Sequence, residues 1–217
     1  MSRKDTALLS IYRSLQYWFW RLSTTRLTLG PNIARYYMYD RMRETAKSFA
    51  SRKGDVLSVS QSGWLCNTMH LEPTRLVEAD YPEYNLLALP FADASFDFVV
   101  CDMVLEHVEG NPQKAVDEIR RILRDGGVAV LATAFIYRFH PAPGDFWRFS
   151  SQGLRLLFAD FSRVLDCDGW GNFKATRLLR TKLRYVGIPR APWHPLHRVA
   201  VKNDPEWPIA TWIVAQK

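Results

Sequence analysis

Two histidines of this 217-residue chain stand beside charged residues that suit acid–base chemistry. His107 directly follows Glu106, and His140 opens a proline-rich stretch that also holds Asp145 and Arg148. An imidazole titrates near neutrality, so we expect His140 or His107 to act as the general base for a reacting hydroxyl. Asp145 and Arg148 would orient that base or bind a phosphate or carboxylate group of the substrate. The alternative for His107 is that it only packs beside the site and takes no part in the reaction.

A second set of polar residues follows two short apolar runs. Ser60 to Gly63 ends the first run, and small residues there let backbone N–H groups approach a ligand. Glu78 and Asp80 end the second run, where a carboxylate can bind two ribose hydroxyls. Because parallel strands bring their carboxyl ends to one edge of a sheet, these two turns are expected to share a ligand.

Buried strands and amphipathic helices must position these turns. The patterns predict helices over residues 6–22, 32–49, 112–123 and 151–158, and strands over 55–60, 75–80, 96–102, 128–135, 163–167 and 209–215. The strand, helix and strand over 96–135 are typical of a right-handed parallel crossover. We expect Asn32 and Ser151 to begin their helices as caps, and Asp125-Gly126-Gly127 to end the helix at 112–123.

A longer set of motifs resembles a known family. It comprises Leu89-Pro90-Phe91, Asp93-Ala94-Ser95-Phe96-Asp97, Val104-Leu105-Glu106-His107, Glu118 to Leu123, and Gly126-Gly127. Over residues 54–170 the chain resembles class I S-adenosylmethionine-dependent methyltransferases of the type 11 group, and residues 140–149 resemble one branch of that group. The resemblance implies an α/β fold with a Rossmann-like, mostly parallel seven-stranded sheet flanked by helices, and S-adenosyl-L-methionine as cofactor.

The resemblance also implies which residues contact this cofactor. Asp80 would hold the ribose, with Glu78 as the second candidate. Asn85 would accept a hydrogen bond from the adenine amine. The other implied contacts are the backbone of Leu86 beside the ring, Asp102 and Met103 at the methionine end, and Ser60 and Gly63 in the first turn.

The chain departs from the family pattern at two places. The family's first turn reads G-x-G-x-G, whereas only Gly63 remains here. Residues 80–85 also leave no room for the usual helix between the second and third strands. A variant site that still binds cofactor is favoured, and a non-catalytic domain with a degenerate cofactor site is the alternative.

Charge is divided unevenly along the chain. Residues 1–54 hold 11 Lys and Arg against 3 Asp and Glu, residues 55–168 hold 9 against 17, and residues 169–202 hold 8 against none. This division predicts a basic, helical N-terminal extension over 1–54 and a methyltransferase-like domain over 55–217 with an inserted basic loop region at about 169–207. Such basic segments contact phosphate, nucleic acid or lipid headgroups, or are simply solvated.

Cysteines, histidines and aromatic residues bear on the compartment, on metal binding and on membrane contact. Three scattered cysteines, with no membrane-length apolar run and no signal peptide, favour the cytoplasm. His194-x-x-His197 has a spacing seen in metal sites but lacks a nearby cysteine or carboxylate, so no metal site is expected. The aromatic cluster at residues 17–20 is expected to form a lid over the site, with peripheral membrane contact as the alternative.

Together these patterns predict an S-adenosylmethionine-dependent methyltransferase. The expected reaction is O-methylation of a small-molecule or saccharide-type acceptor. An RNA methyltransferase is a second reading, because the basic segments could follow a phosphate backbone.

Overall fold

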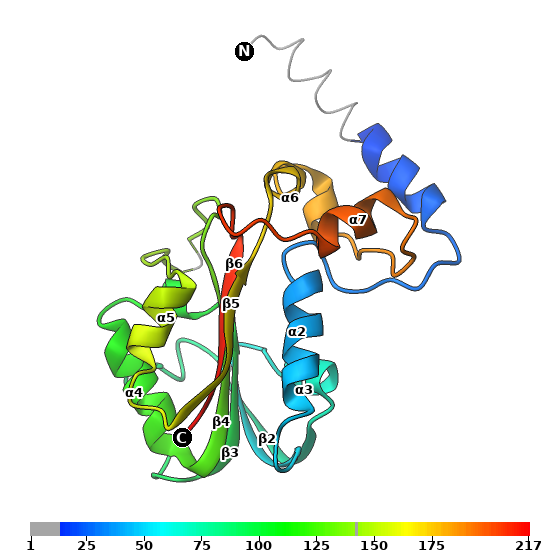
Figure 1. Ribbon diagram of the computed structural model, residues 1–217. Helices are drawn as coiled ribbons and strands as arrows, with labels where there is room; N and C mark the ends of the chain where they lie inside the picture. The colour runs from blue at the N-terminus through cyan, green and yellow to red at the C-terminus, as the bar shows by residue number, and fades with distance from the viewer. Residues whose placement is uncertain (1–13, 142) are drawn as a thin grey trace. The chain divides into compact units, whose positions relative to one another are not determined.

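The structure is a computed structural model that describes residues 14–141 and 143–217. The described residues divide into two units (Figure 1). One unit holds residues 38–169 and 209–217, and the other holds residues 14–37 and 170–208. All of the candidate site residues belong to the first unit.

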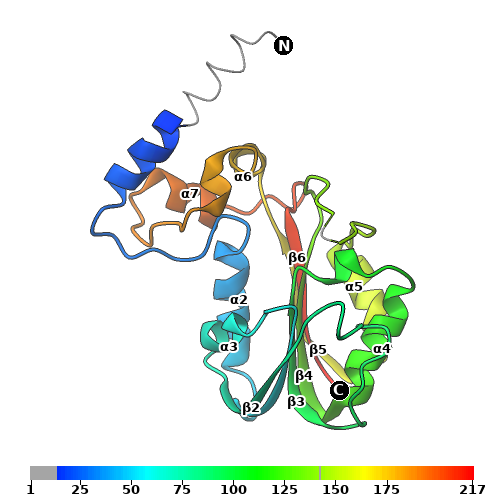
Figure 2. The same cartoon turned by 180° about the vertical axis from the view of Figure 1, so that it is seen from behind.

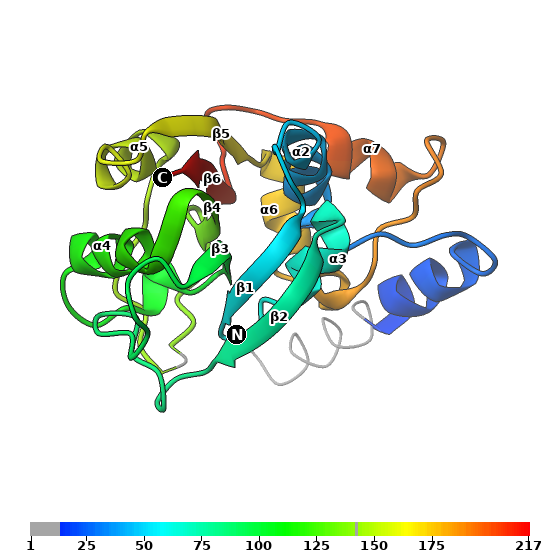
Figure 3. The same cartoon turned by 90° about the horizontal axis from the view of Figure 1, so that it is seen from below.

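A six-stranded sheet forms the centre of the first unit. Its strands are β1 (Lys53–Val59), β2 (Glu72–Ala79), β3 (Phe96–Asp102), β4 (Leu123–Ala134), β5 (Arg163–Trp170) and β6 (Ala210–Gln216). They run across the sheet in the order β2-β1-β3-β4-β6-β5, which Figure 3 shows from one end. β1 pairs in parallel with β2 and β3, and β3 with β4, whereas β4 and β6 are antiparallel. The predicted α/β, mostly parallel sheet is therefore confirmed.

The described residues contain six strands rather than the seven expected. The missing strand would lie between β2 and β3. There the backbone makes only an isolated bridge between Asn85 and Ala88. This short segment turns back toward β3, and side chains of α4 (Pro112–Ile122) hold its backbone through hydrogen bonds described below.

Helices cover both faces of the sheet. Figures 1 and 2 show α2 (Tyr36–Ala46) and α3 (Trp64–Met69) on one face and α4 and α5 (Ser151–Leu157) on the other. One face of α4 is buried against the sheet and includes Ala115, Val116, Ile119 and Ile122. The strand, helix and strand crossover predicted over 96–135 is thus confirmed by β3, α4 and β4.

Two predicted helix boundaries are wrong. Asp125-Gly126-Gly127 does not end α4, because the backbone becomes extended at Leu123 and these residues lie within β4. A Cβ at Gly127 would lie 2.8 Å from the carbonyl oxygen of Arg124, so the glycine serves the close approach of chain at the start of the strand. The N-cap of α5 is Ser150 rather than Ser151, and its hydroxyl accepts from the N–H of Gly153.

The second unit is helical rather than a loop. Residues 14–23 are helical, and α6 (Phe173–Leu178), the 3-10 helix η2 (Lys182–Tyr185) and α7 (Pro195–Val201) follow β5. The Asn172 amide caps α6 and donates to the carbonyl oxygens of Val199 and Lys202, which ties α6 to the end of α7. The predicted helix at 6–22 lies partly outside the described residues. No helix among the described residues is long and apolar enough to span a membrane.

The His194 and His197 pair has local structural partners. His194 caps α7 by accepting from the N–H of Leu196, and its other ring nitrogen lies 3.3 Å from the Ser23 hydroxyl. Nδ1 of His197 lies 3.0 Å from the Tyr36 hydroxyl. These contacts explain both histidines without a metal ion.

Candidate functional site

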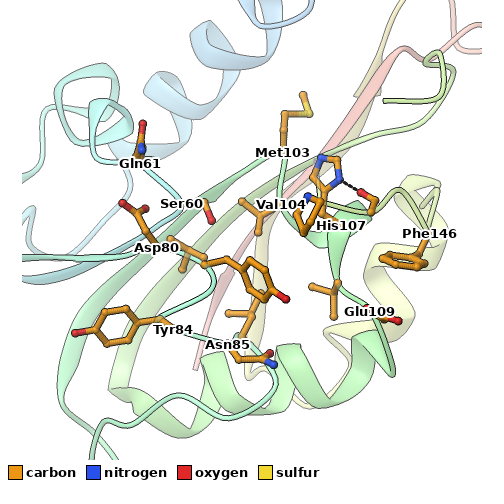
Figure 4. Close-up of a pocket in the computed structure, with 16 residues that line it drawn as sticks. Ser60, Gln61, Asp80, Tyr84, Asn85, Met103, Val104, His107, Glu109 and Phe146 are labelled. Carbon is orange, nitrogen blue, oxygen red and sulfur yellow. Dashed lines mark hydrogen bonds between the residues drawn. The ribbon is translucent and has the colours of Figure 1, made fainter. Parts of the chain in front are cut away.

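A pocket of about 500 Å³ opens at the carboxyl ends of β1, β2 and β3. Figure 4 shows Ser60 and Asp80 on one side of it and His107 and Phe146 on the other. This is the edge where parallel α/β sheets bind ligands. Its lining residues come from the turn after each strand and from the segment before α5: Val59, Ser60, Gln61, Asp80, Tyr81, Tyr84, Asn85, Leu86, Met103, Val104, His107, Val108, Glu109, Pro143, Gly144 and Phe146.

The turn after β1 has a glycine-type backbone without the glycines. Ser60 and Gln61 have φ values of 52° and 59°, in the left-handed region that L-residues other than glycine enter at a cost of about 1–2 kcal/mol each. The Ser62 hydroxyl holds this turn, because it accepts from the backbone N–H of Asp102 at 2.8 Å and donates to the carbonyl oxygen of Val59. Two residues with side chains therefore hold a backbone conformation that favours glycine.

The two carboxylates at the end of β2 have different surroundings. Asp80 lines the pocket, and its Oδ1 is buried without a hydrogen-bond partner. Glu78 is exposed and is not among the lining residues. A Cβ at position 63 would lie 2.5 Å from Oε1 of Glu78, so glycine at this position leaves space for the Glu78 side chain. Gly63 is not a lining residue of the pocket. Of these two candidates, only Asp80 faces the cavity.

Two residues of α4 shape the wall formed by the segment after β2. The Glu118 carboxylate accepts from the N–H of Leu89 at 2.8 Å. Arg121 pairs with Glu118 and donates to the carbonyl oxygens of Leu89 and Phe91. These bonds to Arg121 lower the pKa of Glu118. The Glu-x-x-Arg spacing in the sequence thus serves to hold the Leu-Pro-Phe segment on the helix.

Asn85 and Leu86 both line the pocket. The side-chain oxygen of Asn85 accepts from the N–H of Leu87 at 2.9 Å, so part of its hydrogen-bonding capacity maintains the turn. Leu86 is buried and provides an apolar wall. Tyr84 stacks on Phe91 with nearly parallel rings and adds an aromatic surface that the sequence analysis did not single out.

Met103 and Asp102, at the end of β3, lie in different places. Met103 lines the pocket with a left-handed backbone, at φ 57°. Asp102 is buried behind it and is not a lining residue; its Oδ2 accepts from the hydroxyl of Tyr39 at 3.0 Å. Asp102 therefore links α2 to the end of β3, the strand end that carries Met103.

His107 lines the other side of the pocket and forms a cluster with Glu106 and His140, which are not lining residues. The Glu106 side chain is fully buried, and its Oε2 accepts from the Thr133 hydroxyl at 2.8 Å. Its Oε1 has no hydrogen-bond partner and lies 3.9 Å from Nε2 of His140. Burial raises the pKa of Glu106. The rings of His107 and His140 are 4.9 Å apart, edge to face.

Asp145 and Arg148 lie shortly after His140 in the sequence, and Asp145 contacts His140. The Asp145 side chain is buried, and its Oδ2 accepts from the backbone N–H of His140 at 2.8 Å. Both terminal nitrogens of Arg148 donate to this carboxylate, and they lower the pKa of Asp145. Arg148 is thus paired within the chain, and neither residue lines the pocket. Asp145 contacts both the backbone and the ring of His140.

Residues 32–131 match the family described as a methyltransferase domain, type 11. Over 47 residues the chain is 53% identical to the uncharacterised protein MJ0638 of Methanocaldococcus jannaschii, covering 22% of this chain and 20% of that protein. Over 88 residues it is 35% identical to thiol S-methyltransferase TMT1B of Homo sapiens, covering 41% of this chain and 32% of that enzyme. The matches therefore span less than half the length of these curated relatives.

The crystal structure of an S-adenosylmethionine-dependent methyltransferase from Mesorhizobium loti has the same fold. It matches with a TM-score of 0.54 over 85% of this chain and 98% of that one, at 14% identity. Residues 32–131 form a methyltransferase domain similar to the class I enzymes of the type 11 group, and the fold is that of these enzymes. S-adenosyl-L-methionine is the cofactor of such domains.

The pocket of this methyltransferase domain fits that cofactor. Its volume of about 500 Å³ lies in the range typical of small-molecule sites. A carboxylate oxygen of Asp80 is buried there without a protein partner, and hydroxyl donors of a ribose would satisfy it. Leu86 and Tyr84 add the apolar and aromatic surface that a nucleoside base requires.

Sequence reasoning missed Glu106 as a residue of the methyltransferase site. It was noted beside His107, yet only the structure shows that its carboxylate turns inward toward His140. The signal available was the Leu-Glu-His motif itself. Phe146 and Glu109, which also line the pocket, carry no signal of their own in the sequence.

Proposed function

We propose that this chain is an S-adenosylmethionine-dependent methyltransferase that methylates a hydroxyl oxygen of a small-molecule or saccharide-type acceptor. The observation that carries this proposal is the pairing of two features in one pocket. Asp80 offers an unpartnered buried carboxylate oxygen on one side, and His107 lines the other side, with Glu106 and His140 next to it beyond the lining residues.

The first side would hold the cofactor. Asp80 would accept from the ribose hydroxyls, Asn85 would lie near the adenine edge, and the turn at Ser60 would approach with its backbone. Met103 would line the methionine end. When bound, S-adenosylmethionine supplies a methyl group on a positively charged sulfur, and the carbon–sulfur bond breaks with its electron pair left on sulfur.

The second side would hold the acceptor. A hydroxyl must lose its proton as it attacks, and His107 lines the pocket within reach of such a group. His140 and Glu106 stand behind it. We place the departure of the acceptor's proton at this cluster. Phe146, half exposed at the same rim, would contact an apolar or sugar-ring surface of the acceptor.

Transfer of a labelled methyl group tests the function directly. The protein is incubated with methyl-tritiated S-adenosylmethionine and with hydroxyl, thiol and RNA acceptors in parallel, after calorimetry has measured cofactor binding. Labelling of a hydroxyl compound is the expected result. Preferential labelling of a thiol would refute the choice of oxygen; preferential, salt-sensitive labelling of RNA would favour the nucleic-acid alternative. Failure to bind cofactor would favour a degenerate site.

We propose a membrane surface as a partner of the second unit. Residues 14–23 form a helix whose residues Leu15, Trp18, Phe19 and Leu22 share one face, and all four are more than half exposed. Arg21 lies over the Trp18 ring on the same helix. An exposed apolar stripe with basic neighbours is typical of helices that lie in the headgroup region of anionic membranes.

A further inference from the structure

Glu106, His107 and His140 bring three ligand-type atoms together. One nitrogen from each imidazole and one oxygen from the carboxylate lie within 4.8 Å of one another. Nε2 of His140 lies 3.9 Å from Oε1 of Glu106. No other group of three such residues was found in the part of the chain that the structure describes.

Hydrogen bonds fix which nitrogen of each ring carries the proton. Nδ1 of His107 faces the carbonyl oxygen of Gly144. Nδ1 of His140 faces the carbonyl oxygen of Arg138 at 3.0 Å and a carboxylate oxygen of Asp145 at 3.2 Å. All of these partners only accept, so each neutral ring holds its proton on Nδ1 and keeps a lone pair on Nε2. Metal-binding histidines are oriented in this way.

The carboxylate of Glu106 gives independent support. It is fully buried, and its Oε1 has no hydrogen-bond partner, while Thr133 holds its other oxygen. A buried carboxylate without a cation or donor is costly. A cation at the centre of the cluster would satisfy all three groups together.

We propose that Glu106, His107 and His140 bind one divalent transition-metal ion. Two imidazole nitrogens and one carboxylate oxygen suit Zn²⁺, Fe²⁺, Co²⁺ or Mn²⁺ better than Mg²⁺ or Ca²⁺. Ligand atoms about 2.1 Å from an ion stand roughly 3–3.5 Å apart, so the side chains would close inward by about 1 Å. Three protein ligands leave open positions, as in catalytic sites.

The ion's role rests on the proposed function. A hydroxyl of the acceptor would occupy an open position, and the ion would lower its pKa. The oxygen–hydrogen bond then breaks, the proton passes to water, and the electron pair stays on the oxygen that forms the new bond to carbon. His140 and His107 are ligands in this scheme, and neither ring is a free base.

Metal binding is measured without reference to activity. Chelator-treated protein is titrated with Co²⁺ and followed by visible absorption, and Zn²⁺ is then added as competitor. We expect one Co²⁺ per chain, displaced by Zn²⁺. Glu106→Gln and His140→Ala should each weaken Co²⁺ binding by at least about tenfold. The control is His70→Asn, which removes an exposed histidine at a left-handed position that asparagine tolerates.

Calorimetry with S-adenosylmethionine on the same samples separates the possible failures. Cofactor affinity within about twofold of wild type shows that a variant is folded. The substitutions should leave this affinity unchanged, because Asp80, the proposed ribose contact, lies across the pocket from His107. If Glu106→Gln loses cofactor binding, His107→Gln at the half-buried pocket wall replaces it. Co²⁺ binding that is absent, or that is equally strong in every variant, overturns the metal site while the methyltransferase proposal stands. Wild-type protein that binds Co²⁺ but does not bind S-adenosylmethionine in the calorimeter would refute the proposed function and leave the metal site standing.

Discussion

Asp80→Ala tests the cofactor site most directly. The Oδ1 of Asp80 is buried in the pocket without a partner, so the free protein gains no hydrogen bond from that atom. Two charge-assisted bonds from the ribose would contribute about 2–4 kcal/mol in the complex. At about 1.4 kcal/mol per tenfold change, the substitution should raise the dissociation constant of S-adenosylmethionine by roughly 30-fold to 700-fold.

Titration calorimetry with S-adenosylmethionine and S-adenosylhomocysteine measures this change. The matched control is Glu78→Ala, which removes an exposed carboxylate two residues upstream and should leave affinity within about twofold. The free Asp80→Ala protein should be at least as stable as wild type, because the change removes a buried, unsatisfied oxygen. Tight binding by Asp80→Ala together with weak binding by Glu78→Ala would refute the assignment of the ribose-binding carboxylate.

Three further predictions concern the turn, the pocket wall and the helix at residues 14–23. Gln61→Gly should raise the free energy of unfolding by about 0.5–1 kcal/mol, measured with urea, because glycine enters the left-handed region without strain; a loss of stability would contradict that backbone conformation. The lowered pKa of Glu118 means that its carboxylate stabilises the folded state above the unfolded pKa, and that this contribution is lost as pH falls through the folded pKa. Glu118→Gln should therefore cost about 1–2 kcal/mol at pH 7, and the cost should decrease as pH is lowered below the unfolded pKa in the same urea assay; a cost that does not change with pH would contradict the ion pair. Trp18→Ser with Phe19→Ser should abolish salt-sensitive co-sedimentation with phosphatidylserine vesicles, and wild-type protein that stays in the supernatant would refute membrane contact.

The sheet was predictable where its strands are continuous apolar runs. β3 coincides with the predicted strand at 96–102, because both of its faces are covered by helices and alternation is not needed. The glycine pair at 126–127 was not predictable as part of a strand, since glycines that follow a helix are typical of a helix end. Only the packing of the chain beside Arg124 shows that these glycines serve the start of β4.

The candidate site was predictable in its location and only partly in its members. Asp80, Met103 and His107 follow strand ends or their motif, and all three line the pocket. Asp102 and Glu78 also lie at strand ends, but they do not line the pocket. The direction of a side chain at a strand end depends on the turn that follows. His140 and Glu106 lie 34 residues apart in the sequence, and their approach depends on the path of the segment after β4.

The left-handed residues bear on whether the glycine-poor turn still serves a ligand. Ser60, Gln61 and Met103 all have positive φ, and all three line the same pocket. Each conformation costs about 1–3 kcal/mol and persists only where surrounding contacts hold it. The Ser62 hydroxyl supplies such contacts by joining the end of β1 to the backbone of Asp102. A pocket free of functional demand would be expected to lose this strain, so its retention around the unpartnered oxygen of Asp80 favours a site that still binds cofactor.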